Sequence, residues 1–195
     1  MKIREGIETF QKNAFPEMAE LFEKLGHGQK PEVLMLTCSD SRIDPALVTQ
    51  TLPGDLFVIR NAGNFVPTRE GSGAAATLEY GVQALGCKHI VVCGHSQCGA
   101  VAAALNPSSA DGLPYVAEWL KESGPDLSGI DLAAGDAMEA AVERNVKSQL
   151  ANLRSLPFVA EAEQAGTLEL HGWVYKFETG EIFELDEDHF VALAS

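Results

Sequence analysis

The sequence predicts an α/β fold, namely a single domain with a central, mainly parallel β-sheet flanked by helices and an N-terminal helical arm. Short apolar runs bounded by polar loops are typical of strands that are buried on both faces. Helical segments separate these runs, and strands that alternate with helices imply a parallel sheet with right-handed crossovers. Because 195 residues can bury a substantial core without disulfide or metal staples, we expect one domain over residues 1–195.

The first third of the chain contains the predicted arm and two strands. Residues 1–28 form the arm, because apolar residues from Ile3 to Leu25 recur at helical spacing and Gly26 suits the helix end. PEVLMLTC at 31–38 is the first buried strand. Asp44 and Pro45 suit the start of a short helix, and DLFVIR at 55–60 is the second strand.

The rest of the chain continues the alternation. The segment 72–86 predicts a helix of small residues, HIVVCG at 89–94 a third buried strand, and QCGAVAAAL at 97–105 another helix. Residues 106–131 are rich in Pro, Ser, Gly and Asp, which indicates an irregular connector with a short helix at 115–122. A long helix over 136–154 and a hairpin over 168–186, turning near Thr179 and Gly180, complete the prediction.

Composition excludes some classes of partner. Lys and Arg number 14 against 28 Asp and Glu, and the net charge of -14 repels nucleic-acid phosphates and anionic lipids. We expect neither a nucleic-acid nor a membrane partner, since no apolar run approaches the ~20 residues of a membrane span. The first residues lack the apolar region of a secretory signal, so we expect a cytoplasmic protein, in which the four cysteines favour metal binding or burial over disulfides.

Three potential metal ligands follow predicted strands. Cys38 lies where the first strand meets a polar loop, and His95 and Cys98 lie just after the third. Parallel strands end at one edge of a sheet, where open α/β folds place their sites, and two thiolates with an imidazole favour zinc. Each residue alone also fits ordinary burial, but together they predict zinc with a fourth position open to water. Cys87 and Cys93 lie at a helix end and inside an apolar run, so we expect neither to bind metal.

Asp40 and Arg42 lie beside the first of these ligands. The Asp40 carboxylate can fill the fourth metal position or hydrogen-bond to the group that does. The Arg42 guanidinium, two residues away, can hold that carboxylate in a bidentate pair that keeps it ionised and turned from the metal. The alternative is an ordinary loop aspartate and a surface arginine.

Three motifs in order, CSDSR at 38–42, RNAGN at 60–64 and GHSQCGA at 94–100, resemble the signatures of the beta-class carbonic anhydrases. The segments LVTQTLPGDLFVIRNAGNFVP and LHGWVYKFETGEI extend the similarity over most of residues 29–184. The sequence is most similar to the plant-type subclass and to the bacterial enzymes associated with cyanate metabolism. The resemblance implies one Zn²⁺ per chain and reversible hydration of carbon dioxide to bicarbonate and a proton by zinc-bound hydroxide.

The resemblance also implies a role for four residues that the pattern alone does not single out. Gln29, Phe57 and Tyr80 would line the carbon dioxide pocket across a dimer interface, although by pattern they read as a loop polar residue, strand core and helix core. The backbone N–H of Gly99, at a helix N-terminus, would lie near the bound anion. We therefore expect a homodimer or a larger even-numbered oligomer.

Two rival functions remain at this point. One is a different hydrolytic zinc enzyme on the same scaffold, for example one that acts on carbon disulfide. The other is a non-catalytic protein in which Asp40 closes a structural zinc site with the three other ligands.

Overall fold

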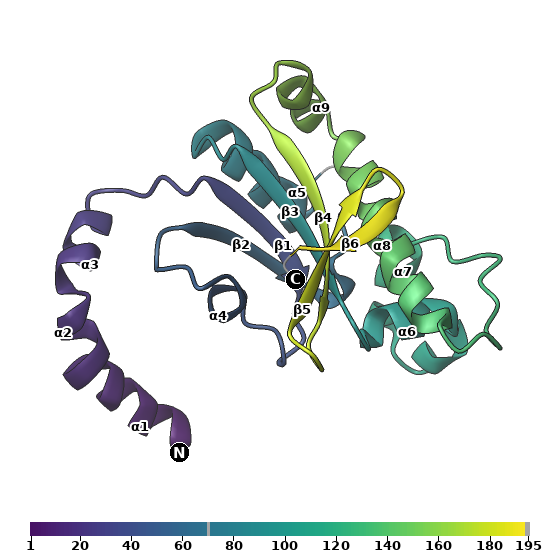
Figure 1. The fold of residues 1–195 in the computed structure, drawn as a ribbon, viewed down its shortest axis with the longest axis horizontal. Coiled ribbons are helices and arrows are strands. Elements are labelled where there is room, and N and C mark those ends of the chain that lie inside the picture. Colours follow the sequence, from purple (N-terminus) through teal and green to yellow (C-terminus); the bar gives the residue numbers. More distant parts are fainter. Residues whose placement is uncertain (70, 194–195) are drawn as a thin grey trace. The chain divides into compact units, whose positions relative to one another are not determined.

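The computed structural model describes residues 1–69 and 71–193 (Figure 1). Its residue contacts divide the chain into two compact units, Met1–Lys30 and Pro31–Ser195. The first unit corresponds closely to the predicted N-terminal arm, and the expectation of one domain over the whole chain stays a prediction. Within the described ranges, no helix is long and apolar enough to cross a membrane.

The N-terminal unit is helical over most of its length, as predicted. Its segments are α1 (Lys2–Thr9), a π-helical turn (Phe10–Ala14), α2 (Phe15–Glu17) and α3 (Ala19–Leu25). Three phenylalanine rings, at positions 10, 15 and 22, lie 5.5 to 6.4 Å apart between centroids. None of the residues in these four segments, all of which the structure describes, is buried. The helical arm therefore presents its apolar side chains to solvent in the single chain.

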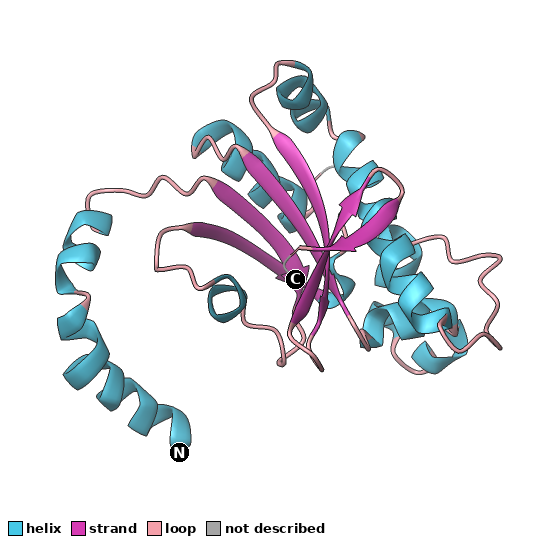
Figure 2. Ribbon diagram, viewed as in Figure 1, coloured by secondary structure: helices cyan, strands magenta, loops and turns pink. Residues whose placement is uncertain are grey.

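Six strands form one sheet in the described part of the second unit (Figure 2). In sheet order they are β2 (Leu56–Asn61), β1 (Val33–Cys38), β3 (His89–His95), β4 (Glu169–Lys176), β5 (Glu181–Asp186) and β6 (His189–Ala192). The first four run parallel to one another, and β5 pairs antiparallel with β4 and with β6. The predicted fold class is thus confirmed, including the hairpin between β4 and β5.

Helices connect the strands in the predicted order. They are α4 (Pro45–Thr49), a 3₁₀ turn (Ala62–Asn64), α5 (Gly73–Glu79) with its π-helical continuation (Tyr80–Ala84), α6 (Gly99–Leu105), a second 3₁₀ turn (Pro107–Ala110), α7 (Pro114–Ser123), α8 (Ala137–Arg154) and α9 (Pro157–Gln164). Asp44 caps α4 by accepting a hydrogen bond from the Leu47 amide, as its position predicted. The sequence prediction omitted α9 and β6, because both are short and weakly periodic.

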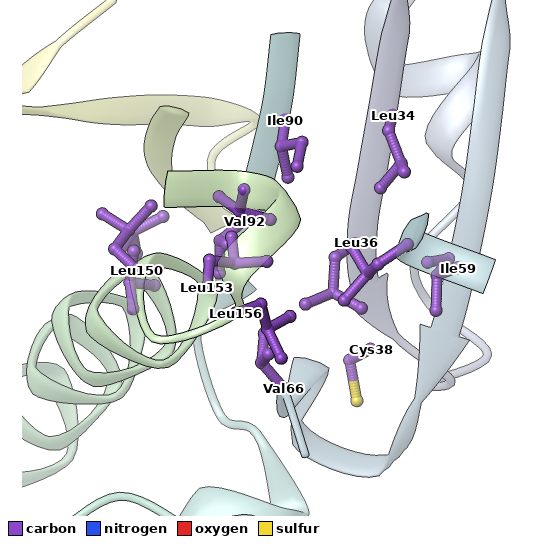
Figure 3. Packing of buried hydrophobic residues seen from close by; sticks show 14 of the residues in the cluster. Leu34, Leu36, Cys38, Ile59, Val66, Ile90, Val92, Leu150, Leu153 and Leu156 are labelled. Carbon is purple, nitrogen blue, oxygen red and sulfur yellow. The ribbon is translucent and has the colours of Figure 1, made fainter. Parts of the chain in front are cut away.

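The main core lies between one face of the sheet and the helices of the second unit, with α8 packed on β3 and β4. Figure 3 shows Leu34, Leu36 and Ile59 from two strands beside Ile90 and Val92, with Leu150, Leu153 and Leu156 across from them. Gly94 permits the close approach of α8, because a Cβ there would lie 2.7 Å from a Val146 methyl group. A smaller cluster on the other face centres on Met35, Val91 and Cys93 of the strands.

Candidate metal centre

Two neighbouring parallel strands and one helix start bring the three predicted ligands together. Cys38 is the last residue of β1, and His95 is the last residue of the adjacent β3. Ser96 and Gln97 then turn the chain, with Gln97 in the left-handed region at φ 52°, so that Cys98 lies at the N-cap position of α6. All three side chains are buried, and their potential ligand atoms lie within 4.8 Å of one another.

The geometry of these atoms fits a tetrahedral zinc ion. The Cys38 and Cys98 sulfurs are 4.0 Å apart, and two Zn–S bonds of 2.3 Å at a tetrahedral angle place sulfurs about 3.8 Å apart. His95 Nδ1 lies 2.7 Å from the Ser96 carbonyl, which only accepts, so Nδ1 carries the ring proton. His95 Nε2 is buried and has no hydrogen-bond partner among the described residues. A metal-ligating histidine usually donates one ring N–H to a carbonyl or carboxylate and offers the lone pair of the other ring nitrogen to the metal, as His95 does here with Nδ1 and Nε2.

A hydrogen bond couples the two ligand sulfurs. The hydrogen bond from Cys98 lowers the pKa of Cys38 to about 4, and the Gly63 N–H, 3.4 Å from this sulfur, adds to the effect. The same hydrogen bond, together with burial, raises the pKa of Cys98. The sulfur pair thus already has thiolate character, and thiolates favour the binding of soft or borderline cations.

The other two cysteines lie in different surroundings. Burial raises the pKa of Cys93 to about 12, and burial also raises the pKa of Cys87. Cys93 belongs to the small cluster on the sheet face opposite the main core. Neither cysteine is part of the cluster that Cys38, His95 and Cys98 form.

Arg42 holds the Asp40 carboxylate in a bidentate pair. Arg42 donates from Nε to Oδ1 at 2.9 Å and from Nη2 to Oδ2 at 2.7 Å, and its backbone N–H also donates to Oδ1 at 2.9 Å. These hydrogen bonds hold the pKa of Asp40 well below its usual range. With two donors on Oδ1 and one on Oδ2, a lone pair on Oδ2 remains available to a further donor.

Residues outside the predicted set fix this pair. The Arg42 guanidinium lies 4.2 Å from the centroid of the Phe177 ring and donates to the Gln97 carbonyl at 3.1 Å. Ser96 donates to the Glu178 carboxylate and accepts from the Phe177 amide, which links the strand end of β4 to the ligand turn. Ser96 in the GHSQC motif was the sequence signal for this contact, but its partner Glu178 lies 82 residues further along the chain.

The RNAGN segment supports the loop that carries Cys38 and Asp40. Arg60 donates to the Cys38 carbonyl at 3.0 Å and to the Asp40 carbonyl at 2.7 Å. Gly63 adopts φ 84°, and a Cβ there would lie 2.5 Å from the Phe65 ring. Only glycine therefore lets this backbone present its N–H to the Cys38 sulfur without strain.

The four residues that the resemblance indicated are dispersed in the single chain. Gln29 is exposed in the N-terminal unit. Phe57 and Tyr80 lie together, with ring centroids 6.0 Å apart. The register pairs Phe57 with Leu34 and Asn61 with Cys38, so Phe57 lies four residues, about 13 Å, from the metal-binding edge. Gly99 is exposed at the first position of α6, directly after Cys98.

Comparison with known proteins identifies the family. Residues 33–182 match the family model described as carbonic anhydrase. Among curated proteins, a carbonic anhydrase of Pseudomonas aeruginosa is 46% identical over 98% of this chain and 91% of its own length. A carbonic anhydrase of Synechocystis is 42% identical over 95% of this chain and 70% of its own length.

Solved structures agree with the sequence relatives. The beta-carbonic anhydrase CcaA superposes with a TM-score of 0.91 at 40% identity, covering 100% of this chain and 92% of that one. A Coccomyxa beta-carbonic anhydrase in complex with acetazolamide has a TM-score of 0.81 at 34% identity over 94% and 85% of the two chains. One of two tetrameric beta-carbonic anhydrases from Sordaria macrospora has a TM-score of 0.77 at 29% identity over 99% of both chains.

Proposed function

Because this chain belongs to the beta class of the carbonic anhydrases, zinc enzymes that interconvert carbon dioxide and bicarbonate, we propose that Cys38, His95 and Cys98 hold its zinc ion. The observation that carries this assignment is the buried, unpartnered Nε2 of His95 beside two sulfurs 4.0 Å apart. A donor set of two thiolates and one imidazole matches the preference of zinc and leaves one position of a tetrahedron to solvent or substrate.

The zinc, when bound, supplies a Lewis acid that lowers the pKa of water, as is established for carbonic anhydrases with other ligands. The residues of this chain then orient the attacking water. We assign Asp40 the role of hydrogen-bond acceptor for the attacking water, through the lone pair on Oδ2 that Arg42 leaves available. An acceptor fixed in this way directs the water oxygen toward the carbon of carbon dioxide.

Arg42 is a positioning residue in this proposal. Its three hydrogen bonds to Asp40, its stacking on Phe177 and its bond to the Gln97 carbonyl keep the carboxylate ionised and in one orientation. The Asp40 carboxylate is not part of the group of ligand atoms that lie within 4.8 Å of one another, so it would have to move to become a fourth zinc ligand. The paired arrangement therefore favours the catalytic role of Asp40 over a closed structural zinc site.

We assign carbon dioxide and bicarbonate contacts to Gln29, Phe57, Tyr80 and the Gly99 N–H. Phe57 and Tyr80 lie about 13 Å along the sheet from the zinc ligands of their own chain. Their place in a pocket thus requires a partner chain, which supports a homodimer or a larger even-numbered oligomer. The exposed apolar residues of the arm, such as Ile3, Ile7 and Phe10, offer a surface for such assembly.

We place the enzyme in the cytoplasm and in the plant-type subclass. The four cysteines are free thiols, and a zinc site built on two thiolates suits a reducing compartment. The subclass assignment depends on Gln29, Phe57 and Tyr80, which stand where the resemblance places the residues of that pocket.

Stopped-flow measurement of carbon dioxide hydration with parallel metal analysis tests the proposal. We expect activity to disappear when a chelator removes the zinc and to return with one equivalent of zinc per chain. Full activity of the metal-free chain, or zinc binding without hydration activity, would contradict it.

A further inference from the structure

A second cluster of metal-binding side chains lies at the amino end of the sheet. His89 begins β3, Glu169 begins the neighbouring β4, and His171 follows two residues later. The parallel register pairs His89 with Glu169 and Val91 with His171, so the three side chains share one face of the sheet. Their potential ligand atoms lie within 4.8 Å of one another.

The separations match those of ligands around one ion. His89 Nδ1 lies 3.2 Å from His171 Nε2 and 3.3 Å from a Glu169 carboxylate oxygen, and His171 Nε2 lies 3.8 Å from that same oxygen. Two bonds of 2.0 to 2.1 Å at a tetrahedral angle place ligand atoms about 3.3 Å apart. The longest separation involves Glu169, whose side chain is 72% exposed and free to adjust.

A carboxylate behind the cluster orients one of its ligands. His171 Nδ1 lies 3.1 Å from Glu184 Oε1, which also accepts a 3.1 Å hydrogen bond from Trp173 Nε1. Because an ionised carboxylate only accepts, His171 carries its proton on Nδ1 and turns the Nε2 lone pair toward His89 and Glu169. A carboxylate that fixes a histidine in this way is the usual outer partner of a metal ligand.

We propose that His89, Glu169 and His171 form a second metal site, which binds a divalent transition metal such as zinc. In the metal-free chain the His89 Nδ1–H donates to its two neighbours. Metal binding at Nδ1 requires the other His89 tautomer, in which the ring proton lies on Nε2 and Nδ1 offers its lone pair. The site is accessible, because the His89, His171 and Glu169 side chains are 38%, 27% and 72% exposed. Nitrogen and oxygen donors on partly exposed side chains bind zinc more weakly than two buried thiolates.

Calorimetric titration of the zinc-loaded holoenzyme with Zn²⁺ tests this site. We expect the wild type to bind one further equivalent per chain, and His89→Ala and His171→Ala to lose that event. His189→Ala, which removes an exposed histidine of β6 outside the cluster, is the matched control and should keep it. Glu184→Gln should weaken the second event about 10- to 100-fold while leaving the first zinc in place.

The result is separable from the catalytic proposal. All four variants should hydrate carbon dioxide at the wild-type rate, which also shows that they fold, and Cys98→Ser should still bind zinc at the amino-end cluster. Absence of a further equivalent in the wild type, or its persistence in His171→Ala, would overturn the second site without affecting the first. A wild-type chain that binds the further equivalent of zinc but does not hydrate carbon dioxide would instead count against the catalytic site.

Discussion

The two ends of the sheet carry clusters of three potential metal ligands that differ in chemistry and in burial. At the carboxyl end, Cys38, His95 and Cys98 are at most 5% exposed. At the amino end, the side chains of His89 and Glu169 are 38% and 72% exposed. The carboxyl-end loops also surround their cluster with backbone donors and with the Asp40–Arg42 pair. Under the two proposals, buried thiolates, backbone support and the Asp40–Arg42 pair distinguish the catalytic site from the simpler metal-binding site at the amino end.

The largest expected effect follows from removing a ligand at the carboxyl end. Cys38→Ser, His95→Ala and Cys98→Ser should each lose zinc from this site and reduce hydration to the uncatalysed background, because the ion keeps only two protein ligands. Metal analysis and stopped-flow assays measure both quantities. Cys93→Ser changes a cysteine on the opposite face and should keep zinc and activity. Wild-type activity in Cys98→Ser would contradict the proposal that the carboxyl-end cluster, and not the amino-end cluster, is catalytic.

The next effect concerns the oriented carboxylate. Asp40→Ala and Arg42→Ala should keep the zinc but hydrate carbon dioxide about 10²-fold more slowly, because acid-base and orienting roles are typically worth that much. The exposed Ser41 lies between them, so Ser41→Ala is the matched control and should retain the wild-type rate. Rates near wild type in both Asp40→Ala and Arg42→Ala would leave the metal alone as the catalyst.

A pocket shared between chains permits a complementation experiment. Phe57→Ala should lower activity to less than half that of the wild type, and Cys98→Ser should abolish it. A dimer that contains one chain of each variant has one pocket with an intact zinc site and an intact Phe57 from the partner. Differently tagged chains, purified as the mixed species, should therefore be more active than either variant alone. Activity of the mixed dimer at half that of the Phe57→Ala dimer would place Phe57 in the pocket of its own chain.

The smallest expected effect separates backbone strain from crowding. Gly63→Ala and Gly166→Ala both place alanine at a positive φ, near the carboxyl and amino ends respectively. Of these two glycines, only Gly63 has neighbours that a Cβ would strike, namely the Phe65 ring and Ala100. Thermal denaturation should show Gly166→Ala destabilised by about 1 kcal/mol and Gly63→Ala by more, with weaker zinc binding. Equal destabilisation with unchanged zinc affinity would show that the turn does not support the metal centre.

The order of elements and the grouping of Cys38, His95 and Cys98 followed from the sequence, because buried parallel strands and Cys or His residues at their ends leave clear patterns. The contacts that support the site could not be predicted from the sequence. Phe177 and Glu178 meet the ligand turn only because β4 lies beside β3, a pairing between residues about 80 positions apart. The cluster of His89 and His171 was equally invisible, since each histidine alone is an ordinary residue at a strand start. Register, rather than local pattern, brings these side chains together.

X-ray absorption at the zinc edge of the wild-type chain, loaded with one equivalent of zinc, tests the central assignment most directly. If Cys38, His95 and Cys98 hold this ion, its first shell contains two sulfur atoms at about 2.3 Å and nitrogen or oxygen atoms at about 2.0 to 2.1 Å. A first shell of nitrogen and oxygen alone would show that zinc fills another site first and would contradict the assignment.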